Sequence, residues 1–337
     1  MEGITYWLPL VWAAILAVAV TLYVILDGFD LGLGILFPFV PQEDRRDIMM
    51  NTVAPFWDGN ETWLVLGGGG LFVAFPKAYG VIMSGLYLPI IVMLLALVFR
   101  GVAFEFRWVS KPKHKFWDLA FAWGSIVASF AQGVVLGGLL QGITMTDGRF
   151  SGGPLDWMTP FALFCGCALV AGYTLLAATW LIYKTDGALE VFARHSAKIA
   201  LLAVLAAAAI ISLWTPFTMP RVAERWFSWP NLLLLSPVPL LTAYAAWSCW
   251  RGLELEKPFQ PFGSAIALFL LGLAGLVISN VPYLVPDKLT VWDAAAAPSS
   301  QMFMLVGTLL MLPVILGYTV FVYWTFRGKV RHGEGYH

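Results

Sequence analysis

The sequence has 337 residues, of which 60% are hydrophobic and only 12% are charged, and its formal net charge is zero. A soluble domain carries about 25% charged residues, so this composition excludes an ordinary soluble protein. The mean hydropathy of +0.79 points to an integral membrane protein in a lipid bilayer. A zero net charge gives no indication of a nucleic-acid-binding surface.

Nine stretches are long and apolar enough to cross a membrane, because a helix needs about 20 such residues to span the hydrocarbon core. The first has no basic residue before it and no small-residue cleavage site behind it, so we expect it to remain as a helix. Short loops leave no room for a soluble domain, and we predict one integral-membrane domain over 1–337. The nine predicted spans are approximately 7–27, 55–76, 80–100, 117–140, 160–183, 198–218, 229–250, 262–285 and 302–326.

The second stretch is unusual because it begins with two acids one helical turn apart, Asp58 and Glu61. Its uninterrupted apolar part runs only from Trp63 to Phe75, which is too short to cross a bilayer alone. The two acids must therefore enter the membrane boundary with it.

Lys and Arg are distributed unequally between the two sides of the predicted helices. If the N-terminus is periplasmic and the C-terminus cytoplasmic, fifteen of the twenty basic residues fall on the inner side, as the positive-inside rule requires. Adding or removing one span would destroy this bias, so it supports an odd number. The inner residues are Arg45, Arg46, Arg100, Arg107, Lys111, Lys113, Lys115, Lys184, Arg194, Lys198, Arg251, Lys257, Arg327, Lys329 and Arg331.

A weak internal similarity suggests how the helices are grouped. The end of the first predicted helix, Tyr23 to Gly28, resembles the end of the fifth, Trp180 to Gly187. We therefore predict an all-α fold with one four-helix bundle over 1–140, a second over 160–285, and a ninth helix at 302–326.

Charged residues from the first three helices converge near the inner boundary in this topology. Helix one brings Asp27 and Asp30, helix two brings Asp58 and Glu61, and helix three ends at Arg100. Ionisable groups at membrane depth are costly and often line a water path, so these five residues are the candidate proton path. In the alternative reading, Asp58 caps helix two, Glu61 lies in its first turn, and Arg100 pairs with a carboxylate.

Glycines accompany this cluster. Gly28 and Gly32 have the small-xxx-small spacing that lets helices pack closely, and Gly67 to Gly70 remove side chains from the middle of helix two. Close helix packing is the preferred interpretation, with a gap for a cofactor as the alternative.

Ligands for a metal or haem are scarce. The four histidines are His114 and His195 in loops and His332 and His337 in the C-terminal tail, and the three cysteines form no metal-binding pattern. Because haem iron in a membrane protein is usually held by an axial His, we predict no catalytic or metal-binding residue in this chain and expect its chemistry to occur in a partner.

Five motifs together closely resemble subunit II of the cytochrome bd quinol oxidases. They extend from the first predicted helix to the last loop. In chain order they are Asp27-Gly-Phe-Asp-Leu-Gly-Leu-Gly34, Asn51-Thr-Val-Ala-Pro-Phe-Trp-Asp-Gly-Asn-Glu-Thr-Trp-Leu64, Ala74-Phe-Pro-Lys-Ala-Tyr79, Phe99-Arg-Gly-Val-Ala-Phe-Glu-Phe-Arg107 and Leu289-Thr-Val-Trp-Asp-Ala294.

This resemblance implies a bacterial inner-membrane complex that oxidises ubiquinol, reduces oxygen to water and contributes to the proton motive force. It implies a heterodimer with subunit I, which holds two haems b and one haem d, and in some complexes a very small third chain. Some members also carry a structural quinone in subunit II. Compact outer loops resemble the cyanide-insensitive branch.

The resemblance also places roles on residues. The proton-path acid of the family corresponds to Asp58, Asp30 and Arg100 match motif positions, and Glu61 departs from relatives that have Gln there. A different class remains open, because two similar halves and intramembrane acids also suit an ion-coupled secondary transporter. A purely structural scaffold is the third reading.

Overall fold

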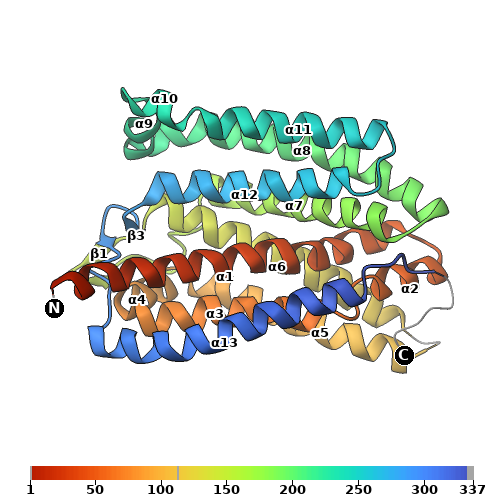
Figure 1. The fold of residues 1–337 in the computed structure, drawn as a ribbon, viewed down its shortest axis with the longest axis horizontal. Coiled ribbons are helices and arrows are strands. Elements are labelled where there is room, and N and C mark those ends of the chain that lie inside the picture. Colours follow the sequence, from red (N-terminus) through yellow and green to blue (C-terminus); the bar gives the residue numbers. More distant parts are fainter. Residues whose placement is uncertain (1, 112–113, 332–337) are drawn as a thin grey trace.

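A computed structural model describes residues 2–111 and 114–331 as a set of long helices that run along one axis (Figure 1). The long helices are α1 (Glu2–Leu36), α3 (Trp57–Ala74), α5 (Tyr87–Val109), α6 (Lys115–Gln141), α7 (Pro160–Lys184), α8 (Gly187–Thr218), α11 (Pro237–Glu254), α12 (Gln260–Asn280) and α13 (Pro298–Thr325). Shorter elements connect them: η1 (Phe37–Phe39), α2 (Glu43–Asn51), α4 (Pro76–Gly85), α9 (Pro220–Phe227), α10 (Asn231–Leu235), and the strands β1 (Met145–Thr146), β2 (Arg149–Phe150), β3 (Tyr283–Val285) and β4 (Leu289–Thr290).

The predicted all-α membrane fold is confirmed. Within the described residues, eight helices are long and apolar enough to cross a membrane, and the bent pair α3 and α4 makes a ninth span when it is counted as one. The two helices of this pair meet at Phe75 with a bend of 120°. Pro76 begins α4, and a proline in that place cannot continue the hydrogen bonding of the preceding helix.

Several predicted boundaries were wrong, among them the start of the sixth span, which lies at Gly187 instead of residue 198, and that of the seventh, which lies at Pro237 instead of residue 229. The first helix does not end near residue 27 but continues to Leu36, because the two acids that follow are buried against partners instead of marking a water interface. The third span begins at Tyr87 instead of residue 80, since the preceding residues form α4. The predicted spans at 117–140, 160–183 and 302–326 match their helices to within a few residues.

The centre of the molecule is the contact of α1 with α7 and α6. A Cβ added at Gly32 would lie 1.9 Å from the Tyr173 backbone oxygen, and one added at Gly34 would lie 2.0 Å from Ser125 Oγ. The backbones can approach this closely only because these positions lack side chains. The close-packing interpretation of the first glycine motif is confirmed. On α3, by contrast, a Cβ added at Gly68 or Gly69 would meet no atom within 4 Å.

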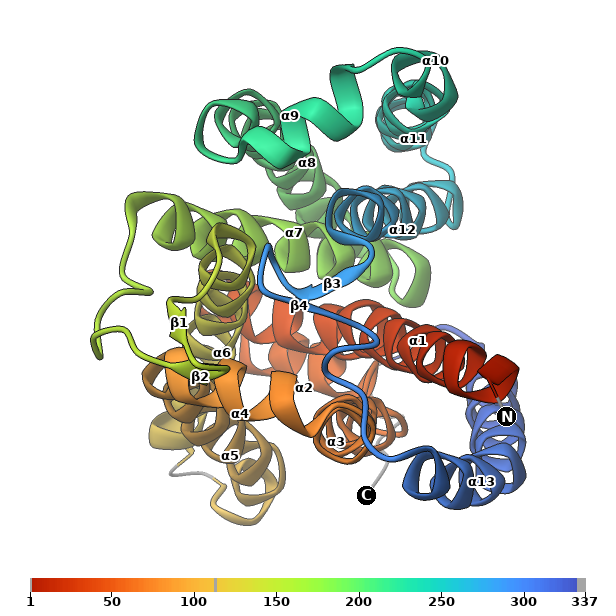
Figure 2. The ribbon, with the colours of Figure 1, turned by 90° about the vertical axis from the view of Figure 1, so that its left-hand side faces the viewer.

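The remaining helices surround this centre (Figure 2). Helix α3 packs on α1, and α5 packs on α6. Helices α8 and α12 pack on α7, and α11 packs on α12 and α8, while α13 lies along α1 and α3. The division into two four-helix bundles plus one helix stays a prediction.

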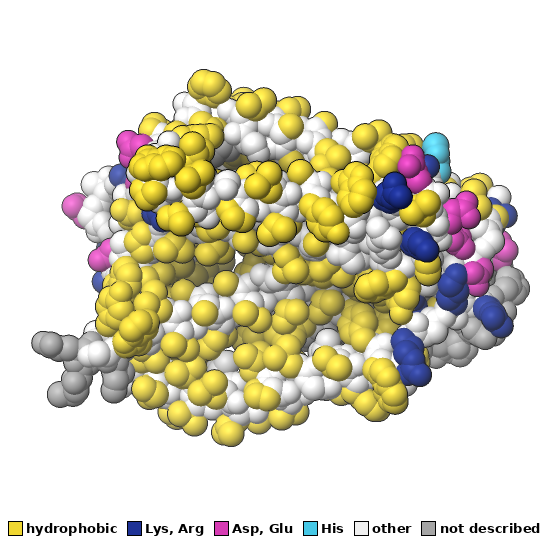
Figure 3. Space-filling model, turned by 45° about the horizontal axis from the view of Figure 1, so that its top comes forward, with side chains coloured by type: hydrophobic (Ala, Val, Ile, Leu, Met, Phe, Trp, Pro, Cys, Tyr) yellow, Lys and Arg dark blue, Asp and Glu magenta, His cyan; other side chains and the backbone are white. Residues whose placement is uncertain are grey.

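Charged side chains gather at the two ends of an apolar surface (Figure 3). One end, which we call the α2 end, carries α2 and the last described residues, and Lys and Arg are concentrated there. The other, which we call the hairpin end, carries the antiparallel pairs β1–β2 and β3–β4 together with α9 and α10. At the hairpin end, Thr290 donates to Asp293 from both its hydroxyl and its backbone N–H, which holds the pKa of Asp293 below its ordinary value.

Candidate functional site

Four of the five predicted proton-path residues meet in one buried cluster. Arg100 of α5 donates to Asp27 of α1 from one nitrogen and to Glu61 of α3 from another, the second at 3.2 Å. Arg100 and Asp27 are fully buried, while the Glu61 side chain is 27% exposed. One guanidinium therefore joins three helices at a point between the middle of the bundle and the α2 end.

Asp30 completes the cluster through residues that the sequence did not single out. Asn60 Nδ2 donates to Asp30 Oδ2 at 2.8 Å, and Tyr323 of α13 donates to Asn60 Oδ1 at 2.9 Å. The other Asp30 oxygen is buried and has no hydrogen-bond partner among the described residues. Asp30 thus keeps one acceptor oxygen available inside the protein.

A second polar chain leads deeper between the helices. Gln132 of α6 donates to the Tyr23 hydroxyl at 2.7 Å and accepts from the Tyr173 hydroxyl of α7 at 2.8 Å. Tyr23 lies one turn before Asp27 on α1, so α1 carries polar groups on successive turns of one face. No signal in the sequence distinguishes Gln132 from other residues of an apolar helix.

The fifth predicted residue, Asp58, lies outside the cluster. It is in the first turn of α3 and is exposed on the surface of the chain. The residue at the N-cap is Phe56, and no side chain caps this helix, so the alternative in which Asp58 caps helix two is wrong. Asp58 and Glu61 are three residues apart and are therefore neighbours on one face of α3. Asp58 is exposed, whereas Glu61 is partly buried and accepts from Arg100.

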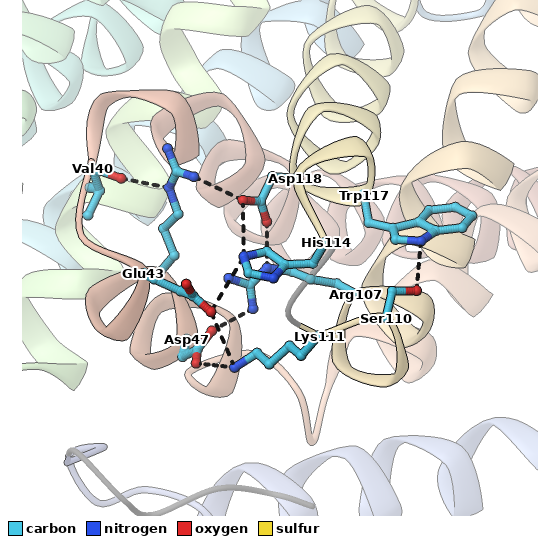
Figure 4. Close-up of polar contacts among 10 residues, drawn as sticks. Val40, Glu43, Asp47, Arg107, Ser110, Lys111, His114, Trp117 and Asp118 are labelled. Carbon is cyan, nitrogen blue, oxygen red and sulfur yellow. Dashed lines mark hydrogen bonds and ion pairs between the residues drawn. The ribbon is translucent and has the colours of Figure 1, made fainter.

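A separate group of charges ties α2 to the α5–α6 hairpin at the α2 end (Figure 4). Buried Arg107 donates to Asp118 at 2.6 Å and to Asp47 at 2.5 Å, Arg46 pairs with Asp118 at 2.9 Å, and Lys111 reaches Asp47 at 2.5 Å. We call Arg46, Asp47, Arg107, Lys111 and Asp118 the clamp cluster. The guanidinium groups of Arg46 and Arg107 both lie over the ring of Phe37, which is an apolar residue. We therefore interpret the clamp cluster as structural.

The described histidines do not fit a haem site. His114 Nε2 lies 3.5 Å from a Glu43 oxygen and 3.8 Å from an Asp118 oxygen, beside the clamp cluster, and His195 is exposed on α8. No group of three or more metal-ligating side chains occurs in residues 2–111 and 114–331. His332, His337 and Lys113 lie outside the described residues.

Comparisons with known proteins agree on one family. The family model described as cytochrome bd terminal oxidase subunit II matches residues 8–326. Cytochrome bd-I ubiquinol oxidase subunit 2 of Escherichia coli K12 is 29% identical, with 96% of this chain and 95% of the relative covered. Cytochrome bd ubiquinol oxidase subunit 2 of Bacillus subtilis 168 is 30% identical, with 96% and 97% covered.

A solved structure has the same fold. A chain of the bd oxidase from Geobacillus thermodenitrificans superposes with a TM-score of 0.79 at 18% identity, covering 95% of this chain and 98% of that one. Together with the relatives, this match favours an oxidase subunit over an ion-coupled carrier.

Proposed function

The chain belongs to the family of cytochrome bd terminal oxidase subunit II, and we propose that within its oxidase it forms a proton inlet that opens toward the cytoplasm. It is a multi-pass subunit of a quinol-oxidising oxidoreductase complex in the bacterial inner membrane, with a subunit I as its partner. Haem cofactors and a quinol substrate belong to this family. We further propose that subunit I holds two haems b and one haem d. The proposal also includes a very small third chain in the complex and a structural quinone bound in this subunit.

The observation that carries the inlet is the arrangement of α3. Its first turn presents Asp58 on an exposed face, and its next turn places Glu61 against Arg100 inside the protein. Acids are expensive at this depth of a membrane unless they are paired or solvated. An exposed acid directly beside a buried acidic cluster is therefore better suited to proton exchange than to holding helices together.

Each residue has a distinct proposed role. Glu61 and Asp30 bind and release protons, and Arg100 supplies the counter-charge that keeps Asp27 and its neighbours in place. Asp58 passes protons across the exposed face of α3 to subunit I. The free oxygen of Asp30 supports this role, because a carboxyl group with an available oxygen can accept a proton or a water molecule.

The proposed direction explains how the complex stores energy without a pump. Oxygen reduction consumes protons from the inner side, while quinol oxidation releases them outside. Every elementary charge that crosses is worth about 2.3 kcal/mol per 100 mV. An inlet that opened outward would cancel this gain.

The test is Asp58→Asn in the assembled heterodimer. We expect quinol-driven oxygen consumption to fall about tenfold or more, as the loss of a proton-transferring group usually causes, while haem absorbance per complex stays within the wild-type range. Asp58→Glu should retain most of the activity. Asp44→Asn, which changes an exposed acid of α2 at the same end, is the matched control. Normal turnover in Asp58→Asn would contradict the inlet and favour the scaffold reading.

A further inference from the structure

We propose that Lys184 is a positioning residue that fastens the end of α13 to α7 and thereby holds Tyr323 against Asn60. This inference rests on the proposed inlet, because the contact it controls is the one that supports Asp30. We call the contacts of Lys184 with residues 326–330 the tail clasp.

The clasp begins with a buried amine at the last residue of α7. Lys184 is only 2% exposed, and its Nζ donates to the backbone oxygen of Phe326 and, at 2.6 Å, to that of Gly328. The backbone oxygen of Lys184 accepts in turn from Val330 N–H at 2.9 Å. Lys329 adds a bond to the Thr185 oxygen at 3.0 Å. The segment after α13 therefore both accepts hydrogen bonds from Lys184 of α7 and donates one to it.

A lysine is well suited to this position. The last carbonyl groups of a helix lack partners within the helix and lie at its negative end, so a cation that binds there is favoured. Phe326 is the C-cap residue of α13, and Lys184 binds its carbonyl oxygen. Lys184 Nζ also lies over the rings of Trp180 and Phe56, 5.4 and 6.0 Å from their centroids, where a cation is attracted.

Helix α13 depends on this fastening because its own packing is slight. Among its residues only Gln301, near the hairpin end, is fully buried. At the opposite end, Tyr323 stacks on Phe56 with ring centroids 4.3 Å apart, and its hydroxyl donates to Asn60. Tyr323 lies three residues before Phe326, so the clasp acts within one helical turn of the hydroxyl that bonds Asn60.

Loss of the clasp should therefore propagate along a short series of contacts. Without it, the last turn of α13 can move, Tyr323 leaves Asn60, and Asn60 is no longer held in the orientation that donates to Asp30. Lys184 touches neither Asp30 nor Asp58 in any described contact, so its effect on them is indirect, and the proposed route runs through Tyr323 and its hydrogen bond to Asn60.

The experiment uses the assembled heterodimer carrying Lys184→Met, Tyr323→Phe, or both. Hydrogen exchange by mass spectrometry follows the amide of Val330, and the infrared carboxyl band that disappears in Asp30→Asn reports on Asp30. Quinol-driven turnover is measured across pH. Lys198→Met, which removes an amine of α8 that lies 5.8 Å from the Trp250 ring centroid, is the matched control.

We expect Lys184→Met to speed exchange at Val330 about tenfold, since losing hydrogen bonds of this class corresponds to about that factor in an opening equilibrium. The Asp30 band should shift in the same direction as in Tyr323→Phe. The double variant should turn over no more slowly than Tyr323→Phe alone, and Lys184→Arg should restore part of the loss. Lys198→Met should behave as wild type.

Unchanged exchange and an unchanged Asp30 band in Lys184→Met would overturn the proposal, as would a double variant whose two losses multiply. If Lys184→Met fails to assemble, Val330→Pro removes one bond of the clasp without touching the buried amine. Because proline has no amide hydrogen to exchange, the Asp30 band is then the readout, and it should shift less and in the same direction. Normal turnover in Asp30→Asn would refute the inlet, whereas the exchange and infrared measurements would still decide whether the clasp positions Tyr323.

Discussion

Arg100 is the residue on which the buried cluster depends. It is fully buried, and it is bonded to an equally buried Asp27 and to Glu61. A buried pair of this kind adds little net stability compared with apolar residues of similar size, but removing one partner leaves an uncompensated charge. Replacing Arg100 or Asp27 alone should therefore destabilise the subunit far more than replacing both together.

We predict that Arg100→Gln lowers the stability of the subunit by about 3–5 kcal/mol, the usual cost of breaking a buried pair. The assembled complex should accumulate poorly, as measured by haem absorbance per unit of membrane protein. Asp27→Asn combined with Arg100→Gln should recover most of the assembly, because neither charge is then left alone. A double variant that assembles no better than Arg100→Gln would contradict this account.

At this scale the sequence predicted charged residues better than neutral ones. Helix order alone brings Asp27, Asp30, Glu61 and Arg100 to one depth, since antiparallel neighbours return to the same side. Asn60 and Tyr323 were missed because neutral polar residues are common in membrane helices and carry no charge that demands an explanation. Tyr323 is also 263 residues from its partner, and no local pattern records so distant a contact.

The contact between α1 and α7 is the element-scale feature that places the cluster. Gly32 lies one turn after Gly28 and two residues after Asp30. An added Cβ at Gly32 would overlap the Tyr173 backbone oxygen and lie 2.6 Å from the Ala177 Cβ. A backbone atom cannot move aside as a flexible side chain can. Any side chain at this position must therefore push the two helices apart.

We predict that Gly32→Ala destabilises the subunit by about 1–3 kcal/mol or more, as overpacking of a well-packed contact does. The thermal midpoint of the assembled complex should fall, and the shift of α1 relative to α7 should disturb the Tyr173–Gln132–Tyr23 chain. Gly272→Ala on α12 is the control, because an added Cβ there meets nothing within 4 Å. Equal midpoints for the two variants would show that the close approach is not required.

Element boundaries could be predicted only where apolar composition changes at the true end of a helix. Span 160–183 was placed well because Thr159 caps α7 through the Ala162 N–H and a polar stretch follows Lys184. The end of α1 was not placed well. Asp27 and Asp30 ended the run of apolar residues on which the prediction relied, but the helix continues because both acids have buried partners. The second predicted span ends at 76, close to the bend at Phe75, but residues 80–85, which we expected to begin the third span, belong to α4.

For the whole molecule, the two ends of the apolar surface differ in charge. Within the described residues, fourteen of the nineteen Lys and Arg residues belong to the elements that meet at or near the α2 end or to the loops beside it. Basic residues near membrane helices remain preferentially on the cytoplasmic side. We therefore propose that the α2 end faces the cytoplasm, which also gives the inlet its required direction, and that the hairpin end faces the periplasm.

Labelling of single cysteines tests this orientation. Cys165 and Cys249 are buried, so Cys167→Ala provides a background with little reactivity of its own. On that background, Asp147→Cys places a thiol in the exposed turn between β1 and β2, and Asp44→Cys places one in the exposed first turn of α2. A membrane-impermeant maleimide should label the first variant in intact spheroplasts and the second only after the membrane is opened.

The reverse pattern would place the buried cluster nearer the periplasm. Protons taken up there would return to the side on which quinol releases them, and the charge separation worth about 2.3 kcal/mol per 100 mV for each charge would be lost. The orientation therefore decides more than topology. Asp58 can serve an energy-conserving oxidase as an inlet only if the thiol of Asp44→Cys, at the α2 end, is protected until the inner face is exposed.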